Sequence, residues 1–364
     1  MFKLPSYLPP DLSADYLRAA PDAMFIPAPA DFVAPDGYHA TTIFPEYFKV
    51  GGEWLLAGRS RMDCVAILEN GEIHVREFRH IKRGDMVAVG RTEDGGDGIY
   101  VYPGGFSQQT NAQESFAFRQ GRSRETAFSV DYDFLYDLLK HDREHGHIVW
   151  VMGPACTFDA DSRKAFEGLV EKGFVHALLA GNALATHDLE GAYLNTALGQ
   201  DIYTQKPFPN GHYNHIDTLN RVRLHGSMER FIEAEGIDNG IVYSCVKKNI
   251  PIVLIGSVRD DGPMPEVIGD VYEGQDAMRE HLSKATTVIA MATTLHTIAA
   301  GNITPMFHVL PCGTVRPVYF YTVDISEFSA NKLADRGSLS AKSIITNVQD
   351  FIVQLSKQLD AWKG

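Results

Sequence analysis

The feature that most constrains the fold is one layout that recurs along the chain, an apolar run that stops abruptly at small, polar or charged residues. The clearest case is Val175 to Ala180, which stops at Gly181-Asn182; the acidic segment behind it predicts a helix opening at Asp188. Four other runs share this layout: Ile148 to Met152, Ile252 to Ser257, Val288 to Met291 and Val318 to Val323. Such runs are typical of buried strands in an α/β domain.

Helical patterns lie between and after these runs. They cover residues 131 to 144, 162 to 172 with Asp161 or Ser162 as N-cap and Gly173 at C′, 188 to 198, 215 to 235 with a break at Gly226, 239 to 249, 273 to 284, 294 to 300 and 348 to 362. Strands that alternate with helices predict an α/β fold with a parallel sheet covered on both faces. Because ligands bind beyond the carboxyl ends of such strands, we expect the five strand ends to converge on the active site.

The first third of the chain has a different pattern. Residues 1 to 50 are rich in proline, which prevents long helices and central strands, so we expect an extended arm packed over another surface. Residues 51 to 128 contain short strands and turn signals, the strongest being a hairpin around Asn70-Gly71, and predict a small β domain. The α/β domain is then expected to span residues 129 to 364.

Composition narrows the class of protein. A formal net charge of −13 without a Lys/Arg cluster argues against a nucleic-acid partner. The cysteines lack CxxC spacing and predict reduced thiols in a reducing compartment: Cys64, Cys156, Cys245 and Cys312. No uninterrupted apolar stretch reaches ~18 residues and the N-terminus does not predict a signal peptide, so we expect a cytoplasmic protein without a membrane partner.

A dinucleotide is the first ligand to test for the predicted crevice. No G-x-G-x-x-G follows any strand, yet Gly181 to Ala183, Gly256-Ser257 and Gly301-Asn302 offer close backbone approach and amide donors at helix starts. Asp324 ends its strand where an acidic residue would accept hydrogen bonds from a ribose. The alternative is that these glycines only form turns and that Asp324 caps a helix.

Titratable side chains gather at the same strand ends: His187, Asp188, Glu190, Asp260, Asp261 and His296. In a dry cleft such groups can hold an ammonium group or transfer a proton. The alternative is that Asp188 and Asp260 cap helices and His296 is a core histidine. Lys247 is a further residue that could face the crevice. His212 and His215 have a helical spacing but no third ligand in register, so no metal site is predicted.

Several segments, in order along the chain, resemble the archaeal-type ornithine cyclodeaminase family, the LOR/SDH conserved-region family. They are Glu77 to Asp85, Leu179 to Glu190, Gly211 to His215, Lys247 to Gly262 and Asn331 to Ser338. The resemblance covers roughly residues 55 to 355. Lys248 to Pro251 followed by Arg259 to Gly262 is similar to a strand of deoxyhypusine synthase, whose Rossmann-like fold and NAD-binding mode this family shares.

The resemblance implies NAD-dependent conversion of ornithine to proline and ammonia, through transient loss of a hydride from the α-carbon, and assembly as a homo-oligomer. The NAD contacts expected at the strand ends are Asn182, Ala183, Gly256, Ser257, Thr293, Thr294, Asn302 and Asp324. Asp188, Asp261 and His296 are expected to act on substrate or protons, with Lys247 beside them. Arg259 is expected to hold a carboxylate in a bidentate fork.

Two segments depart from the family pattern. Cys156 to Ala160 replaces a His-Thr-Gly-Gly type segment, and Arg119 to Glu125 replaces a Met-Ser-Ser-rich one. Both are expected to border the active site, so two alternatives stay open. One is an NAD-dependent redox enzyme acting on another basic amino acid, a polyamine or an opine-like substrate. The other is a non-catalytic regulator that binds NAD or an amino acid.

Overall fold

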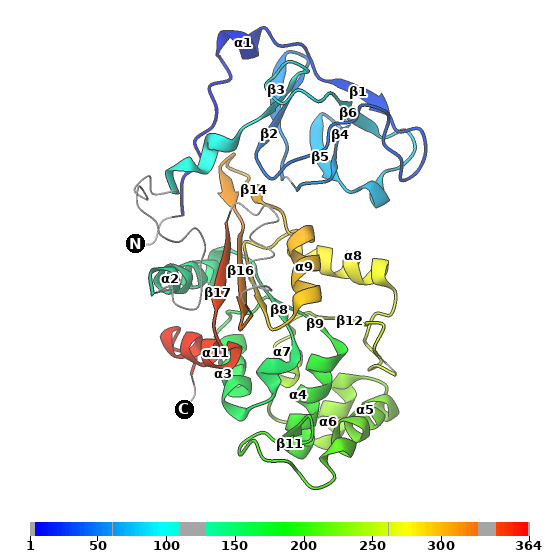
Figure 1. Ribbon diagram of the computed structural model, residues 1–364, viewed down its shortest axis with the longest axis vertical. Helices are drawn as coiled ribbons and strands as arrows, with labels where there is room; N and C mark the ends of the chain where they lie inside the picture. Colours follow the sequence, from blue (N-terminus) through cyan, green and yellow to red (C-terminus); the bar gives the residue numbers. More distant parts are fainter. Residues whose placement is uncertain (1–3, 60, 110–128, 261, 327–339, 363–364) are drawn as a thin grey trace.

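The computed structural model describes residues 4–59, 61–109, 129–260, 262–326 and 340–362. A β region formed by the N-terminal part of the chain lies at one end of the long axis, and an α/β domain forms the rest (Figure 1). Both parts of this arrangement were expected from the sequence.

The α/β domain is built on a parallel sheet in the order β12-β9-β8-β13-β16-β17. Its strands are β8 (Ile148–Met152), β9 (Ala177–Gly181), β12 (Ile252–Ile255), β13 (Thr287–Met291), β16 (Tyr319–Asp324) and β17 (Ala341–Ile345). The chain moves outward from β8 in one direction and then from β13 in the other. The strand order therefore reverses between β8 and β13, where ligands of open α/β sheets bind.

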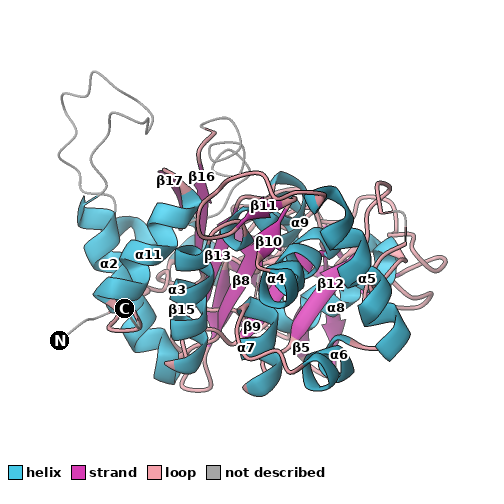
Figure 2. Ribbon diagram, turned by 90° about the horizontal axis from the view of Figure 1, so that it is seen from below, coloured by secondary structure: helices cyan, strands magenta, loops and turns pink. Residues whose placement is uncertain are grey.

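Helices cover both faces of this sheet, because side chains along each buried strand point alternately to the two faces (Figure 2). One face carries α2 (Ser129–His145), α3 (Ala160–Glu171), α4 (Asn182–Leu194), α7 (Ile241–Lys247) and α11 (Val348–Gln358), with α5 (Asn214–His225) and α6 (Met228–Glu235) outside α4. The other face carries α8 (Val271–Leu282) and α9 (Thr294–Ile303).

Two helix starts differ from the sequence-based expectation. Helix α4 begins at Asn182, directly after β9, and not at Asp188, because the run of good helix formers after Gly181 needs no acidic residue to open it. Helix α3 is capped by Asp159, whose carboxylate accepts from the Ser162 amide at 3.0 Å, and not by Asp161 or Ser162. The break at Gly226 is confirmed, with a left-handed φ of 81°.

The β region confirms the hairpin expected at Asn70-Gly71. These residues have φ of 54° and 82°, as a primed turn requires, and join β4 (Val65–Glu69) to β5 (Glu72–Arg76). Other strands here are β3 (Glu53–Leu56), β6 (Met86–Val89) and β7 (Ile99–Val101).

The N-terminal segment differs from the expected arm. Strand β1 (Met24–Pro27) pairs with β6, and β2 (Glu46–Val50) lies between β3 and β7. Pro27 is the last residue of β1 and Pro45 precedes β2, so neither removes a donor from the interior of a strand, and proline density did not exclude pairing. The boundary expected near residue 50 has no counterpart in the strand pairing.

The β region packs on the edge of the α/β domain where the parallel strands begin (Figure 1). A hairpin of β14 (Phe307–Val309) and β15 (Val315–Pro317) makes part of this contact, since Phe307 packs in one cluster with Ile43 and Leu56. The opposite edge, where the strands end, faces away from the β region. Among the residues described, no helix combines the length and apolar character that crossing a bilayer requires.

Candidate active site at the carboxyl ends of the strands

A cleft of about 480 Å³ lies at the carboxyl ends of β8, β9, β12 and β13. It is lined by Met152, Gly153, Pro154, Gly181, Asn182, Ala183, Leu184, Ile255, Ser257, Val258, Arg259, Asp260, Ala292, Thr293, Thr294, Leu295 and His296. Four of the five strand ends singled out in the sequence thus meet in one place, beside the point where the strand order reverses.

Helices begin at this cleft without a side-chain cap. Helix α4 starts after Gly181, α9 starts after Thr293, and a short 3-10 turn, η3 (Pro154–Thr157), starts after Gly153. The first backbone amides of a helix have no acceptor within the helix. Among the described residues, no side-chain cap is found at these three starts. Amides in this position, aided by the helix dipole, bind phosphate groups.

Close backbone approach adds to this character. A Cβ atom at Gly153 would clash with the carbonyl oxygen of Ala292, and a Cβ at Gly181 would lie 3.1 Å from Cε1 of His296. A side chain at Gly153 would therefore displace the backbone after β13, and one at Gly181 would press on the His296 ring. The two glycines therefore allow the backbone and the His296 ring to pack closely at the floor of the cleft.

His296 lies in the first turn of α9, and its imidazole lines the cleft. Its Nδ1 is 3.3 Å from Oγ1 of Thr293. Burial lowers the pKa of His296 below its ordinary value, and the nearby Asp260 carboxylate opposes that shift only in part. His296 is therefore a neutral imidazole near pH 7, able to accept a proton.

The loop after β12 holds the charged groups of the cleft. The Ser257 amide donates to Oδ2 of Asp260 at 2.6 Å, and the Asp260 amide donates to the Ser257 carbonyl at 3.0 Å. Asn182 faces this loop's continuation, since its Oδ1 accepts from the Met264 amide at 3.1 Å. Arg259 lines the cleft with an exposed guanidinium group.

Most residues predicted from the sequence lie together here. The cleft contains Asn182, Ala183, Ser257, Arg259, Thr293, Thr294 and His296, and Gly256 lies between two lining residues. Asp324 ends β16 at the same edge, where its Oδ1 accepts from the Ser326 amide at 2.8 Å, but it does not line the cleft. Asp261 lies outside the described residues, as do the segments 119 to 125 and 331 to 338.

Asn302 is not at this site. It lies near the C-terminal end of α9, beside the β region, and lines a different cavity together with Thr41 and Met306. From the sequence, Gly301-Asn302 was expected to offer amide donors at a helix start, but Asn302 lies near the end of α9, most of a helix away from the end of β13.

Asp188 is buried away from the cleft, which corrects its expected catalytic role. Its Oδ1 accepts from Nε of Arg163 at 2.9 Å, and its Oδ2 accepts from the Val242 amide at 2.7 Å. Both side chains of this ion pair are almost fully buried, 4% exposed for Arg163 and 0% for Asp188. Asp188 therefore ties α4 to α3 and α7, and both of its carboxylate oxygens are engaged inside the protein and not at the cleft.

Neighbouring His187 and Glu190 pair with each other in the same way. Nδ1 of His187 lies 2.8 Å from Oε2 of Glu190, while Oε1 of Glu190 accepts from the Thr196 hydroxyl at 2.7 Å. Neither residue lines the cleft.

Lys247 is also wrongly placed by the sequence. It ends α7, which leads into the start of β12, and so lies at the opposite edge of the sheet from the cleft. Its exposed Nζ donates to the Tyr243 hydroxyl at 2.9 Å, one helical turn earlier.

Gly153 and Leu295 line the cleft without having been assigned a role from the sequence. The signal for Gly153 was its place directly after the buried run Ile148 to Met152. Leu295 gave no signal, because an exposed leucine at a helix start looks like any surface residue; it is 71% exposed here.

Comparisons with known proteins identify the family of the chain. A family model described as arginine dihydrolase ArgZ-like, C-terminal, Rossmann fold matches residues 135 to 355. The ornithine cyclodeaminase of Methanococcus maripaludis is 35% identical over 341 residues, which cover 92% of this chain and 78% of that protein.

Two solved structures extend the comparison. The crystal structure of a conserved LOR/SDH protein from Methanococcus maripaludis has a TM-score of 0.84 and 35% identity, covering 93% of this chain and 98% of that one. The ternary complex of AgrE with ornithine and NAD+ has a TM-score of 0.57 and 30% identity, covering 95% of this chain and 47% of that one. The resemblance stated from the sequence is confirmed.

Proposed function

Because the chain belongs to the archaeal-type ornithine cyclodeaminase family, we propose that it converts ornithine to proline and ammonia with NAD as cofactor. The observation that carries the proposal is the cleft at the carboxyl ends of the strands, where uncapped helix starts and a neutral imidazole lie together. One relative with this fold has been solved with ornithine and NAD+ bound.

The residues of the cleft fit a dinucleotide. The amides that open α4 and α9 would hold the diphosphate, with Asn182, Ala183 and Thr293 beside it. Gly256 and Ser257 would offer backbone contacts, Thr294 would lie at the start of α9, and Asp324 would reach the ribose from the end of β16. When bound, NAD supplies a reversible acceptor for the hydride of the substrate's α-carbon.

Other groups of the cleft would hold and deprotonate ornithine. Arg259 would bind the α-carboxylate and Asp260 would face an ammonium group, so that the substrate's charges meet opposite charges. His296 would accept the proton from the reacting amine through Nε2, since its Nδ1 faces Thr293. Asp261 remains a proposed partner in this proton transfer.

The test is to incubate the purified protein with NAD and ornithine and to follow proline and ammonia by mass spectrometry. Proline formation that requires NAD supports the proposal. An Arg259→Gln variant should raise KM for ornithine about tenfold or more, since a charge-assisted bond to the carboxylate is lost. Bound NAD without any proline from ornithine would discard this substrate while keeping the cofactor.

We also propose that the protein is a cytoplasmic homo-oligomer. Its cysteines are unpaired and three of them are buried, which supports a reducing compartment. Exposed apolar side chains on α5 and on the segment between α4 and α5 support a contact between copies: Leu198, Tyr203, Phe208, Tyr213, Ile216 and Leu224. A monomer by light scattering at micromolar concentration would contradict the oligomer.

A further inference from the structure

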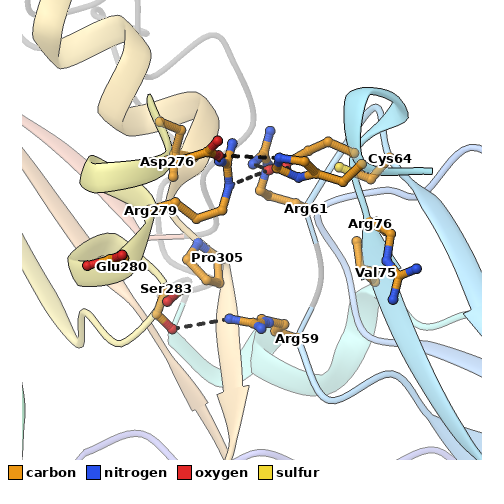
Figure 3. Close-up of a pocket in the computed structure, with 13 residues that line it drawn as sticks. Arg59, Arg61, Cys64, Val75, Arg76, Asp276, Arg279, Glu280, Ser283 and Pro305 are labelled. Atoms are coloured by element: carbon orange, nitrogen blue, oxygen red, sulfur yellow. Dashed lines mark hydrogen bonds and ion pairs between the residues drawn. The ribbon is translucent and has the colours of Figure 1, made fainter. Parts of the chain in front are cut away.

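A second cavity, of about 510 Å³, lies between the β region and the ends of α8 and α9, at the edge of the sheet where the strands begin (Figure 3). It shares no lining residue with the cleft described above. From the β region it is lined by Arg59, Arg61, Cys64, Val75, Arg76, Glu77 and His80, and from the α/β domain by Asp276, Arg279, Glu280, Ser283, Ile303 and Pro305.

Two carboxylates are shared by several cations along one side of this cavity. Oε1 of Glu77 accepts from Arg61 and, at 3.1 Å, from Nε of Arg279. Asp276 accepts from Arg279 at 2.5 Å and from Arg79 at 2.5 Å. These pairs join the β region to α8, so the segment Glu77 to Asp85, singled out in the sequence, docks the two parts of the chain.

Guanidinium donors exceed their acceptors in this network. Nε of Arg61 is buried and has no hydrogen-bond partner among the residues that the structure describes. Arg59 meets no carboxylate among those residues, and its one contact there is a long one, 3.5 Å from Nη1 to the Ser283 carbonyl (Figure 3). A cationic surplus of this kind stands out in a chain with a formal net charge of −13.

The cavity has the chemistry of a binding site and not of a reaction site. Burial raises the pKa of the Cys64 thiol to about 11, so the one sulfur in the lining is protonated and not nucleophilic. Leaving a buried guanidinium N–H without an acceptor is energetically costly, and a bound oxyanion would offset part of that cost. The volume is within the range of small-molecule sites, ~300–1,000 Å³.

We propose that this cavity binds a small carboxylate, whose oxygens lie between Arg59 and Arg61. The guanidinium fork suits a planar carboxylate, and both arginines come from the segment that follows β3. Glu280, on the opposite wall, is an exposed carboxylate positioned on α8. It would hold the ammonium group if the ligand is an amino acid, whereas a dicarboxylate would gain nothing from it.

Calorimetric titration of the full chain with succinate and with L-glutamate tests the site. We expect saturable binding of at least one acid, weakened about tenfold or more in Arg59→Gln and in Arg61→Gln, because a charge-assisted bond is lost in each. Arg83→Gln is the matched control, since Arg83 is exposed, lies in the same docking segment and does not line the cavity. It should bind like the unmodified protein.

The two acids distinguish the source of the carboxylate. Tighter binding of L-glutamate, lost in Glu280→Gln, identifies an amino acid, and tighter binding of succinate identifies a plain dicarboxylate. NAD binding at the other edge of the sheet monitors folding of each variant, and Arg59 is exposed, so its replacement is tolerated. No binding of either acid at about 10 mM, or equal affinity in Arg59→Gln and the unmodified protein, would overturn the proposal.

Discussion

His296 is the residue on which the proposed chemistry depends most. Replacing it with glutamine removes the neutral imidazole while keeping a polar side chain at the start of α9, so we expect kcat to fall about 10²–10⁴-fold. NAD affinity should change little, because the helix-start amides do not depend on this side chain. His74→Gln is the control, since His74 lies on β5 in the β region. Equal kcat in His296→Gln and the unmodified enzyme would remove His296 from the mechanism.

The pH dependence of the reaction follows from the same residue. Burial lowers the pKa of His296, and the neutral form is the base, so activity is retained above the ordinary histidine value and lost as pH falls through the lowered pKa. We expect the acidic limb of kcat to lie below pH 6.5. An acidic limb that stays unchanged in His296→Gln would show that another group titrates.

Asp188 has a different role from the one the sequence suggested. In Asp188→Asn the buried guanidinium of Arg163 loses its counter-charge, so we expect a loss of about 3–5 kcal/mol of unfolding free energy. The kcat of the protein that remains folded should be close to normal. Urea unfolding with Asp217→Asn as the exposed control measures the first effect, and active-site-normalised kinetics measures the second. A stable but inactive Asp188→Asn would restore a catalytic role.

The positions of side chains at the carboxyl edge could be predicted from the sequence where neighbours in the chain determine them. Asn182, Thr293 and His296 follow buried strands directly, so their place at the carboxyl edge could be inferred from the apolar runs. The role of Asp188 could not, because its partner Arg163 lies 25 residues earlier and meets it only across two packed helices. Nothing in a single sequence records that contact.

At the scale of elements, the alternation of strand and helix was predictable and some boundaries were not. Five apolar runs became five parallel strands, since continuous burial on both faces leaves a clear pattern. β17 was not predicted, because Lys342 and Ser343 interrupt the apolar pattern of Ala341–Ile345. The strands β1 and β2 were hidden by the prolines around them.

Three histidines stack where the loops before β8 and β9 meet α8. The ring centroid of His147 lies 5.5 Å from that of His176 and 6.2 Å from that of His281. Burial lowers the pKa of His147 from 6.5 to about 4, and its neighbours are shifted the same way. The unfolded chain therefore binds more protons than the folded one between these values, and stability falls as pH drops from 6.5 toward 4.

Unfolding of the unmodified protein and of His147→Gln at a series of pH values tests this stack. The glutamine cannot take up the proton, so the loss of stability between pH 6.5 and about 4 should be smaller in the variant. Parallel stability curves for the two proteins would show that the stack does not contribute to acid sensitivity.

At the scale of the whole molecule, the parallel sheet separates two sites. The cleft lies where the strands end, and the β region docks where they begin. Glu77 of the β region and Asp276 of α8 each pair with an arginine of the other part. This separation explains why substitutions in the docking segment are expected to leave NAD binding intact. It also makes NAD binding a measure of folding that is independent of the second cavity.

NAD should stabilise the folded chain as a whole. A ligand that binds only the native state adds about 2.7 kcal/mol to the unfolding free energy at a concentration of 100 times Kd. Thermal unfolding with increasing NAD should therefore raise Tm progressively. The gain should be reduced in Gly153→Ala, because the added Cβ would overlap the Ala292 carbonyl and displace backbone that lines the cleft. A Tm independent of NAD would contradict binding to the native fold.

The most direct test of the central claim is the fate of deuterium placed on the α-carbon of ornithine. If NAD in the cleft accepts this hydride and the same hydride returns after ring closure, the proline formed should retain the deuterium, with one ammonia released per proline. Mass spectrometry of the product in ordinary water measures this. Proline without deuterium, or no proline from a preparation that binds NAD, would contradict the account.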